Sequence, residues 1–214
     1  PYKSPTDMGV NMIGSAIIDD EACREASKQE IIRRYFATAC NVKKGLAEPS
    51  ELHKQEMLMN YLHLTPDMRP CVPETGAPAA AIELPDGRIV TGKTSGLMGA
   101  CSAALLNSLK TLAGIHDRVN LIAPMVLAPI QHLKVEHLGN SNPRLHTDEV
   151  LIALSMSAVT NPTAEMAMEA LSGLRGGEVH SSVILSSVDE NTFKKLGMHV
   201  TYEPVYQSHA LYHK

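Results

Sequence analysis

The change in hydrophobic period near the end of the chain constrains the fold most. Residues 179–186 form a strand-like run, and residues 189–196 read as a short helix stopped by Gly197. Residues 198–204 then alternate apolar and polar side chains, as a half-buried strand does. The helix between the two runs is close to the shortest crossover that can join parallel strands. We therefore expect a compact β-α-β unit and, with it, a sheet.

A second pair of strands is expected in the middle of the chain. Residues 79–84 and 88–93 are β-type runs on either side of Pro85-Asp86-Gly87, which is typical of a hairpin turn. The remaining apolar patterns have helical spacing. The sequence thus predicts an α+β (mixed α/β) fold, a predominantly helical body with a β-hairpin and a C-terminal β-α-β unit. Helices are expected over about 19–44, 50–65, 97–113, 124–133, 147–159 and 163–174.

Three of these helices carry specific expectations. In the second helix, Leu58, Tyr61 and Leu62 form the apolar stripe that should face the core. The helix from about residue 97 begins among small residues, which would let another backbone approach closely. Thr147 is the expected N-cap of a helix whose body, residues 150–159, is apolar nearly all round and should be central and buried.

The proline-rich passage 66–78 separates a helical beginning from the rest of the chain. We expect residues 1–65 to be an N-terminal helical segment packed on a mixed α/β body of residues 66–214, together forming one compact domain. The chain opens on Pro1 rather than Met, and its first residues resemble the middle of a protein. It is therefore predicted to be a fragment of a longer protein.

Composition excludes several classes of function. The formal net charge is −4, and no basic stretch suits nucleic acid or a membrane surface. The longest apolar runs, near 97–106 and 123–130, are too short to span a bilayer. The four cysteines are widely spaced without a C-x-x-C pair, which favours reduced, mostly buried thiols. With no leader sequence recognised, a cytosolic protein is expected.

The run from Gly87 to Thr94 satisfies G-x-x-x-x-G-K-[ST], the pattern of a phosphate-binding loop. Such a loop wraps its amides around an anion, whereas residues 89–91 are β-branched and suit a strand. Two interpretations stay open here, a phosphate loop and a hairpin strand. A smaller anion site is also conceivable, because Lys93, Thr94 and Ser95 precede a helix. Ser95 could equally serve only as a helix cap.

Other candidate ligand-binding residues lie at the ends of predicted elements. His146 and Asp148 stand at a helix start and His180 at a strand start, where polar side chains can line clefts. Asp7 and Asn11 lie in a polar, turn-rich opening that could be a binding loop or a linker. The ten histidines show no metal-binding spacing, so no metal is predicted, and no catalytic residues are assigned.

The opening residues 1–11 and the segments 19–34 and 146–161 resemble a bacterial family, the domain of unknown function 1846, and the resemblance extends to Tyr212. Members of that family are about twice as long, so the chain resembles their C-terminal half. Their upstream half contains a Gly-rich segment ending in Gly-Lys that is similar to a phosphate loop. The resemblance therefore implies that any nucleotide chemistry belongs to a missing N-terminal domain.

Two functions are compatible with these features. In the first, the chain is the C-terminal domain of a larger cytosolic protein and forms part of an interdomain site for a nucleotide or another phosphorylated small molecule. In the second, it is a non-catalytic oligomerisation or scaffold module, whose small-residue helix and apolar helices pack between subunits. A homo-oligomer is expected, with the missing N-terminal domain as a partner. Whether the chain is an enzyme is left open.

Overall fold

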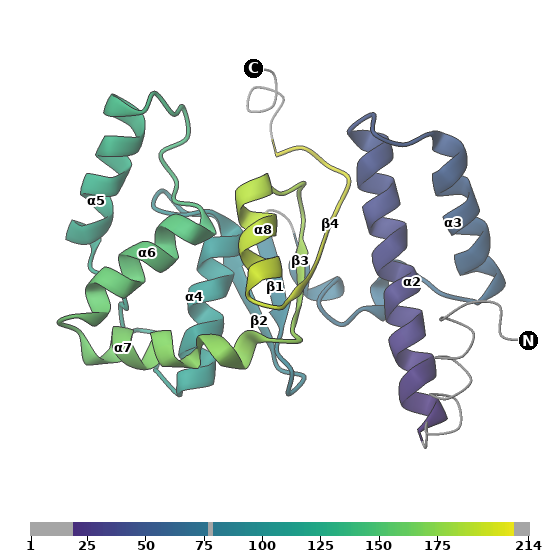
Figure 1. Ribbon diagram of the computed structural model, residues 1–214, viewed down its shortest axis with the longest axis horizontal. Helices are drawn as coiled ribbons and strands as arrows, with labels where there is room; N and C mark the ends of the chain where they lie inside the picture. Colours follow the sequence, from purple (N-terminus) through teal and green to yellow (C-terminus); the bar gives the residue numbers. More distant parts are fainter. Residues whose placement is uncertain (1–18, 77–78, 208–214) are drawn as a thin grey trace, which may run out of the picture.

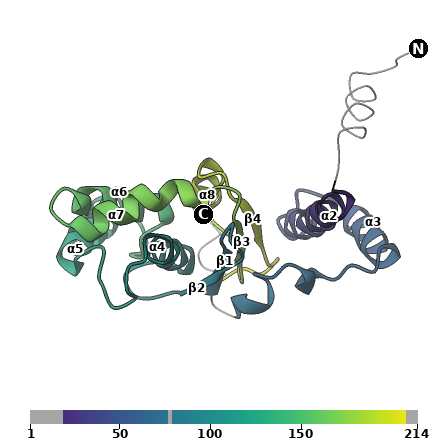
Figure 2. The ribbon, with the colours of Figure 1, turned by 90° about the horizontal axis from the view of Figure 1, so that it is seen from below.

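The computed structural model of the chain describes residues 19–76 and 79–207. A four-stranded sheet lies at its centre, in the order β2-β1-β3-β4. Helices cover one face of the sheet, and a separate helical pair flanks the other (Figures 1 and 2). The predicted α+β class is confirmed.

The strands have the pairing that the sequence predicts. β1 (Ala79–Glu83) and β2 (Ile89–Lys93) form an antiparallel hairpin, with Ala79 opposite Lys93. β3 (Glu178–Ser181) and β4 (His199–Tyr202) are parallel neighbours joined by α8 (Ser187–Lys195). The hairpin and the β-α-β unit meet where β1 pairs antiparallel with β3.

The phosphate-loop match is therefore a hairpin strand. Residues 89–93 of the pattern are β2, and Gly87 takes a positive φ of 83° in the turn. Gly92 has a packing role, because a Cβ there would lie 2.1 Å from the backbone nitrogen of Ala104. No side chain fits between the strand and the helix at that point. The two glycines are thus explained by the turn and by close packing.

The helices over one face of the sheet form the main core. α4 (Ala100–Ala113) packs on β1 and β2, and its apolar side joins α6 (Thr147–Ala158), α7 (Pro162–Glu169) and α8. α5 (Pro124–His132) continues into a π-helical turn, Leu133–His137, and a 3₁₀ turn, Ala170–Leu174, follows α7. Pro129 is accommodated inside α5.

The helical pair on the other face is α2 (Asp20–Lys43) and α3 (Pro49–Tyr61). Asp19 caps α2 by accepting the amide of Ala22. Two short 3₁₀ turns, Pro66–Met68 and Pro73–Thr75, lead from this pair to β1. α2 packs against β4, and the centroid of the Phe36 ring lies 4.8 Å from that of His180 on the neighbouring β3. α3 packs on α2 and lies on its side away from the sheet (Figure 2).

Three local expectations were wrong. The N-cap of α6 is His146, and Thr147 is its first residue, buried with its hydroxyl unpartnered among the described residues. α6 is not buried on all sides, because Ile152, Met156 and its C-cap Val159 are 59%, 60% and 83% exposed. The predicted apolar stripe of α3 also faces solvent, and its Tyr61 is 81% exposed. Met59, on another side of the helix, packs on α2 instead.

Candidate functional site

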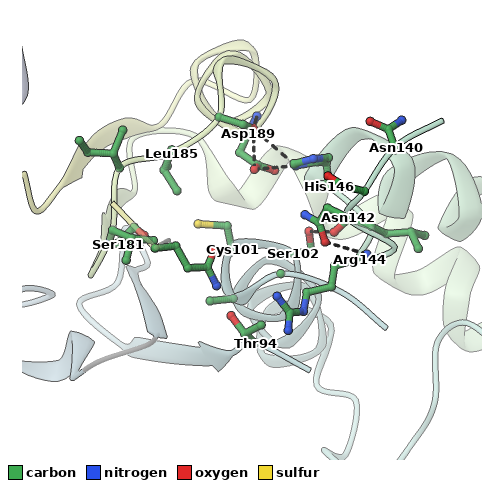
Figure 3. Close-up of a pocket in the computed structure, with 18 residues that line it drawn as sticks. Thr94, Cys101, Ser102, Asn140, Asn142, Arg144, His146, Ser181, Leu185 and Asp189 are labelled. Atoms are coloured by element: carbon green, nitrogen blue, oxygen red, sulfur yellow. Dashed lines mark hydrogen bonds and ion pairs between the residues drawn. The ribbon is translucent and has the colours of Figure 1, made fainter. Parts of the chain in front are cut away.

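A cavity of about 280 Å³ lies where three segments meet. These are the start of α4, the loop before α6, and the segment from the end of β3 into α8 (Figure 3). The cavity lies near the lower end of the ~300–1,000 Å³ typical of ligand pockets. Its polar side chains come from Thr94, Ser102, Asn140, Ser141, Asn142, Arg144, His146, Ser181, Ser186, Asp189 and Gln207.

A histidine–carboxylate pair lines this cavity. The Nδ1 atom of His146 lies 2.9 Å from Oδ2 of Asp189. The hydrogen bond to Asp189, reinforced by its negative charge, raises the pKa of His146 above its ordinary value of 6.5 although burial opposes this. The side chain of His146 is 30% exposed, so the ring is accessible from the cavity. A ring with these properties can donate or accept a proton near neutral pH.

Asp189 is fixed by donors on all sides. Its Oδ1 accepts the amide of Thr147 at 2.9 Å, and its Oδ2 accepts the hydroxyl of Ser186 at 2.8 Å as well as facing His146. Burial alone would raise the pKa of Asp189, but these hydrogen bonds and the charge of His146 outweigh burial and lower it. The carboxylate is therefore a permanent negative partner for the imidazole.

A buried lysine holds the backbone on both sides of His146. Lys134 is 4% exposed, and its Nζ donates to the carbonyl of Arg144 and to the carboxylate of Glu149, each at 2.7 Å. Glu149 in turn accepts the amide of His146 at 2.7 Å. The chain from Arg144 to Glu149 is thus tied at three points, which keeps the ring of His146 in place beside Asp189.

The opposite wall of the cavity carries positive potential. α4 begins at Ala100, and the first amides of an α-helix have no acceptor within the helix. Arg144 lines the same wall near Thr94 (Figure 3). Its Nε donates to the carbonyl of Ser95 at 2.9 Å, and no described carboxylate forms an ion pair with it. Its terminal nitrogens can therefore bind an anion.

The thiol of Cys101 also lines the cavity but is not activated. It is 5% exposed, and burial raises its pKa well above the ordinary range. Only the thiolate is a strong nucleophile, so this cysteine acts as a neutral side chain in the wall. All four cysteines are free, and Cys40, Cys71 and Cys101 are buried while Cys23 is exposed. The expectation of free, mostly buried thiols is confirmed.

The structure brings together only part of the predicted site. Thr94 and His146 line the cavity, whereas Lys93 is exposed at the end of β2. α4 starts at Ala100 rather than near residue 97, so Ser95 is not its cap; the Ser95 hydroxyl accepts the amides of residues 97 and 98. Asp148 bonds the amide of Glu149 and does not line the cavity. Asp7 and Asn11 lie outside the described residues.

His180 lies on the opposite face of the sheet. It is fully buried, with its Nδ1 2.9 Å from the hydroxyl of Thr201 and its Nε2 3.1 Å from the carboxylate of Glu203. Side chains alternate along a strand, so its neighbour Ser181 faces the cavity instead. His146 and His180 therefore belong to two separate environments.

The sequence did not predict four residues that line or support the cavity: Lys134, Arg144, Ser186 and Asp189. A signal existed for the last two, because Ser186 caps α8 by accepting the amide of Asp189 at 3.1 Å. A serine followed three residues later by an acidic residue is a common helix start. Lys134 and Arg144 gave no such signal, because their roles depend on contacts made only in the folded chain.

Across residues 19–76 and 79–207, no group of three or more metal-ligating side chains could hold a metal ion. Within the same ranges, no helix has the length and apolar character needed to cross a membrane.

The chain matches two family models along almost all of its length. Residues 64–212 match the C-terminal domain of unknown function DUF1846, and residues 1–63 match the N-terminal domain of unknown function DUF1846. The segment before Leu64 thus belongs with the N-terminal domain, so the chain contains more than the C-terminal domain.

The chain is also similar to curated bacterial proteins. The UPF0371 protein SpyM3_1021 of Streptococcus pyogenes serotype M3 is 51% identical over 221 residues, which cover 100% of this chain and 45% of the relative. The UPF0371 protein str1377 of Streptococcus thermophilus is 52% identical with the same coverage. The chain spans less than half the length of these relatives. By the two family matches, the chain belongs to the DUF1846 family.

Proposed function

We propose that this domain binds a small phosphorylated molecule in the cavity between α4 and α8, and that His146 exchanges a proton with it. The observation that carries the proposal is the convergence of the α4 N-terminus, Arg144 and the His146–Asp189 pair on one cavity. In the longer protein, the domain would supply one wall of a site that a further domain completes.

The charge balance of the cavity supports an anionic ligand. Asp189 is its acidic side chain, but that carboxylate is already saturated by His146, Ser186 and the amide of Thr147. The charge left unpaired is positive, from Arg144 and from the start of α4, because the ring of His146 is paired with Asp189. Phosphate groups bind well to helix N-termini and to arginine.

The size of the cavity limits the ligand. A volume of about 280 Å³ suits a small phosphorylated molecule or the phosphorylated part of a larger one. A nucleotide would then extend beyond this domain, which agrees with a site shared between two domains. The chemistry supported is proton transfer by His146 on or next to the bound group.

The proposal is tested by titrating the chain with inorganic phosphate and with ribose 5-phosphate while recording amide NMR spectra. We expect saturable shifts at Ala100, Cys101 and Ser102 and a rise in the pKa of the His146 ring, because a bound anion stabilises the imidazolium. Arg144→Gln should weaken binding by about tenfold or more, since a charged hydrogen bond is lost.

Lys93→Gln is the matched control, because Lys93 is exposed and does not line the cavity. It should leave both titrations unchanged. The proposal would be contradicted if sodium chloride at the same ionic strength produced the same amide shifts as phosphate. It would also be contradicted if Arg144→Gln and Lys93→Gln had equal effects on binding. Binding of ATP with Mg²⁺ by a full-length relative but not by this chain would place the nucleotide part of the ligand on the other domain.

The oligomerisation alternative keeps less support. Its main basis was the run of small residues at the start of α4, and these residues are used within the chain, where Ala100 and Ala104 lie against Gly92 of β2. A homo-oligomer therefore remains a prediction without a contact surface assigned to that helix.

A further inference from the structure

The outer face of α3 carries an apolar stripe that nothing in the described chain covers. Met57, Leu58, Tyr61 and Leu62 are 60%, 41%, 81% and 41% exposed. Their spacing places them along one side of the helix. Leu46, in the connection from α2, is also 74% exposed. We call these five residues the α3 face.

The α3 face is not the surface by which the helix is held in this structure. The small core between α2 and α3 is built from Ile32, Phe36, Met59 and Leu64, all less than 7% exposed. Met59 points to that core while its neighbours Met57 and Leu58 do not. In both views α3 is the outermost helix on this side, beyond α2 and away from the sheet (Figures 1 and 2).

A helix of this length needs more than one weak contact to be stable. α3 has 13 residues, a length at which an isolated helix is marginal in water. Exposed apolar residues scattered singly are ordinary, but a continuous stripe on one helix marks a contact surface. The stripe therefore has the character of an interface.

The family matches bear on what covers the α3 face. α2 and α3 both lie within residues 1–63, which match the N-terminal domain model, whereas the sheet and the cavity lie within residues 64–212. The relatives are more than twice as long as the matched region. The two helices are thus the end of a domain whose other residues lie outside this chain.

We propose that the α3 face is the packing surface for the remainder of the N-terminal DUF1846 domain. The α2–α3 pair then links two bodies. Its outer side belongs to the core of the N-terminal domain, and its inner side is fixed to the sheet of the C-terminal domain. The inner contacts include Cys40 Sγ donating to the carbonyl of Tyr202 at 3.1 Å and Lys44 Nζ donating to the Tyr202 hydroxyl at 2.9 Å.

Ion pairs strengthen the inner contact. Arg33 on α2 lies 3.4 Å from the carboxylate of Glu178 on β3, and both side chains are less than 20% exposed. A domain built onto the α3 face would therefore be held in a defined orientation relative to the sheet. The proposal does not depend on the ligand assigned to the cavity.

A complementation experiment tests it. The part of Streptococcus pyogenes SpyM3_1021 upstream of the matched region is co-expressed with this chain, and the mixture is analysed by size-exclusion chromatography with light scattering. We expect a one-to-one complex in which hydrogen exchange at the amides of α3 slows. The double substitution Leu58→Lys and Tyr61→Lys should weaken the complex by at least about tenfold.

The matched control is Met156→Lys with Val159→Lys at the end of α6, which places the same charges on an exposed apolar surface within residues 64–212. It should leave the complex intact. Because all four side chains are exposed, neither double variant should change the thermal unfolding midpoint of the chain alone by more than a few degrees. Absence of a complex, or a complex lost through the α6 variant and kept by the α3 variant, would overturn the proposal. So would a homodimer of this chain that the α3 variant dissociates, because the occupant would then be a second copy.

Discussion

The sheet separates two histidine–carboxylate pairs with similar geometry and opposite properties. On the cavity side, His146 lies 2.9 Å from Asp189; on the α2 side, His180 lies 3.1 Å from Glu203. In the first pair the carboxylate is the more buried partner, at 12% exposed against 30% for the ring. In the second the ring is 1% exposed and the carboxylate 39%.

The difference shows that the position of the buried partner decides which histidine favours its charged form. The pKa of His146 is raised, chiefly by its hydrogen bond to the buried Asp189. The pKa of His180 is lowered, chiefly by burial, which outweighs the attraction of Glu203. A buried, fully bonded carboxylate stabilises a cation beside it, whereas a buried imidazole stays neutral. Only His146 combines a favoured charge with access to a cavity.

The largest loss of stability is expected from Arg69→Met, on the side of the sheet that faces α2. Arg69 is fully buried and bonds the carboxylate of Glu178 at 2.6 Å and the hydroxyl of Thr201, which also bonds His180. Its loss leaves Glu178 with the weaker contact to Arg33, so we expect the free energy of unfolding to fall by about 3 kcal/mol in urea titrations.

The control for this variant is Arg34→Met, whose ion pair with Glu30 is exposed and should contribute less than about 1 kcal/mol. Phosphate binding to the cavity should be unchanged by Arg69→Met wherever the chain is folded. Equal losses from the two arginine variants would show that the buried network is not the main contact on this side.

A smaller but more selective effect is expected from Asp189→Asn. The substitution removes the charge that pairs with His146 and weakens the contacts to Ser186 and to the amide of Thr147. We expect a loss of about 2 kcal/mol at pH 6 and a fall in the pKa of the His146 ring, both measurable by NMR and urea unfolding. Glu203→Gln should cost less, because that carboxylate is more exposed. A larger loss from Glu203→Gln would reverse the comparison between the two pairs.

The sequence predicted the elements better than the site, and the reason differs between residues. Asp19, Gly114 and Asn161 mark helix ends through local capping, which a sequence displays directly. The β-α-β unit was predicted for the same reason, since its period and its length are local. The cavity depends on where α8 lies against α6, and the contact between Asp189 and His146 spans 43 positions of sequence.

The apolar patterns of α3 and α6 illustrate a second limit. Hydrophobic spacing predicts that one side of a helix is buried, but it does not say against what. Leu58 and Tyr61 were expected in the core and lie at the surface, as do Met156 and Val159. For α3, the proposed contact with the rest of the N-terminal domain would explain why an apolar pattern lies at the surface of this chain.

The smallest effect is expected in the pH dependence of stability. The contributions of His146 and His180 to stability should change with pH in opposite directions. The raised pKa of His146 means that its pair stabilises the fold fully below the ordinary value of 6.5, and this contribution disappears as pH rises through the raised pKa. The lowered pKa of His180 gives the opposite behaviour: its contribution is present above 6.5 and disappears as pH falls through the lowered pKa. Asp189, whose pKa is also lowered, adds a further loss only below the ordinary 3.8 of its carboxyl.

Unfolding free energies between pH 5 and pH 9 should therefore show the wild type losing stability relative to His146→Gln on the alkaline side and relative to His180→Gln on the acidic side. Parallel pH profiles for the two variants would mean that both rings share one protonation behaviour, and the separation between the two faces of the sheet would no longer hold.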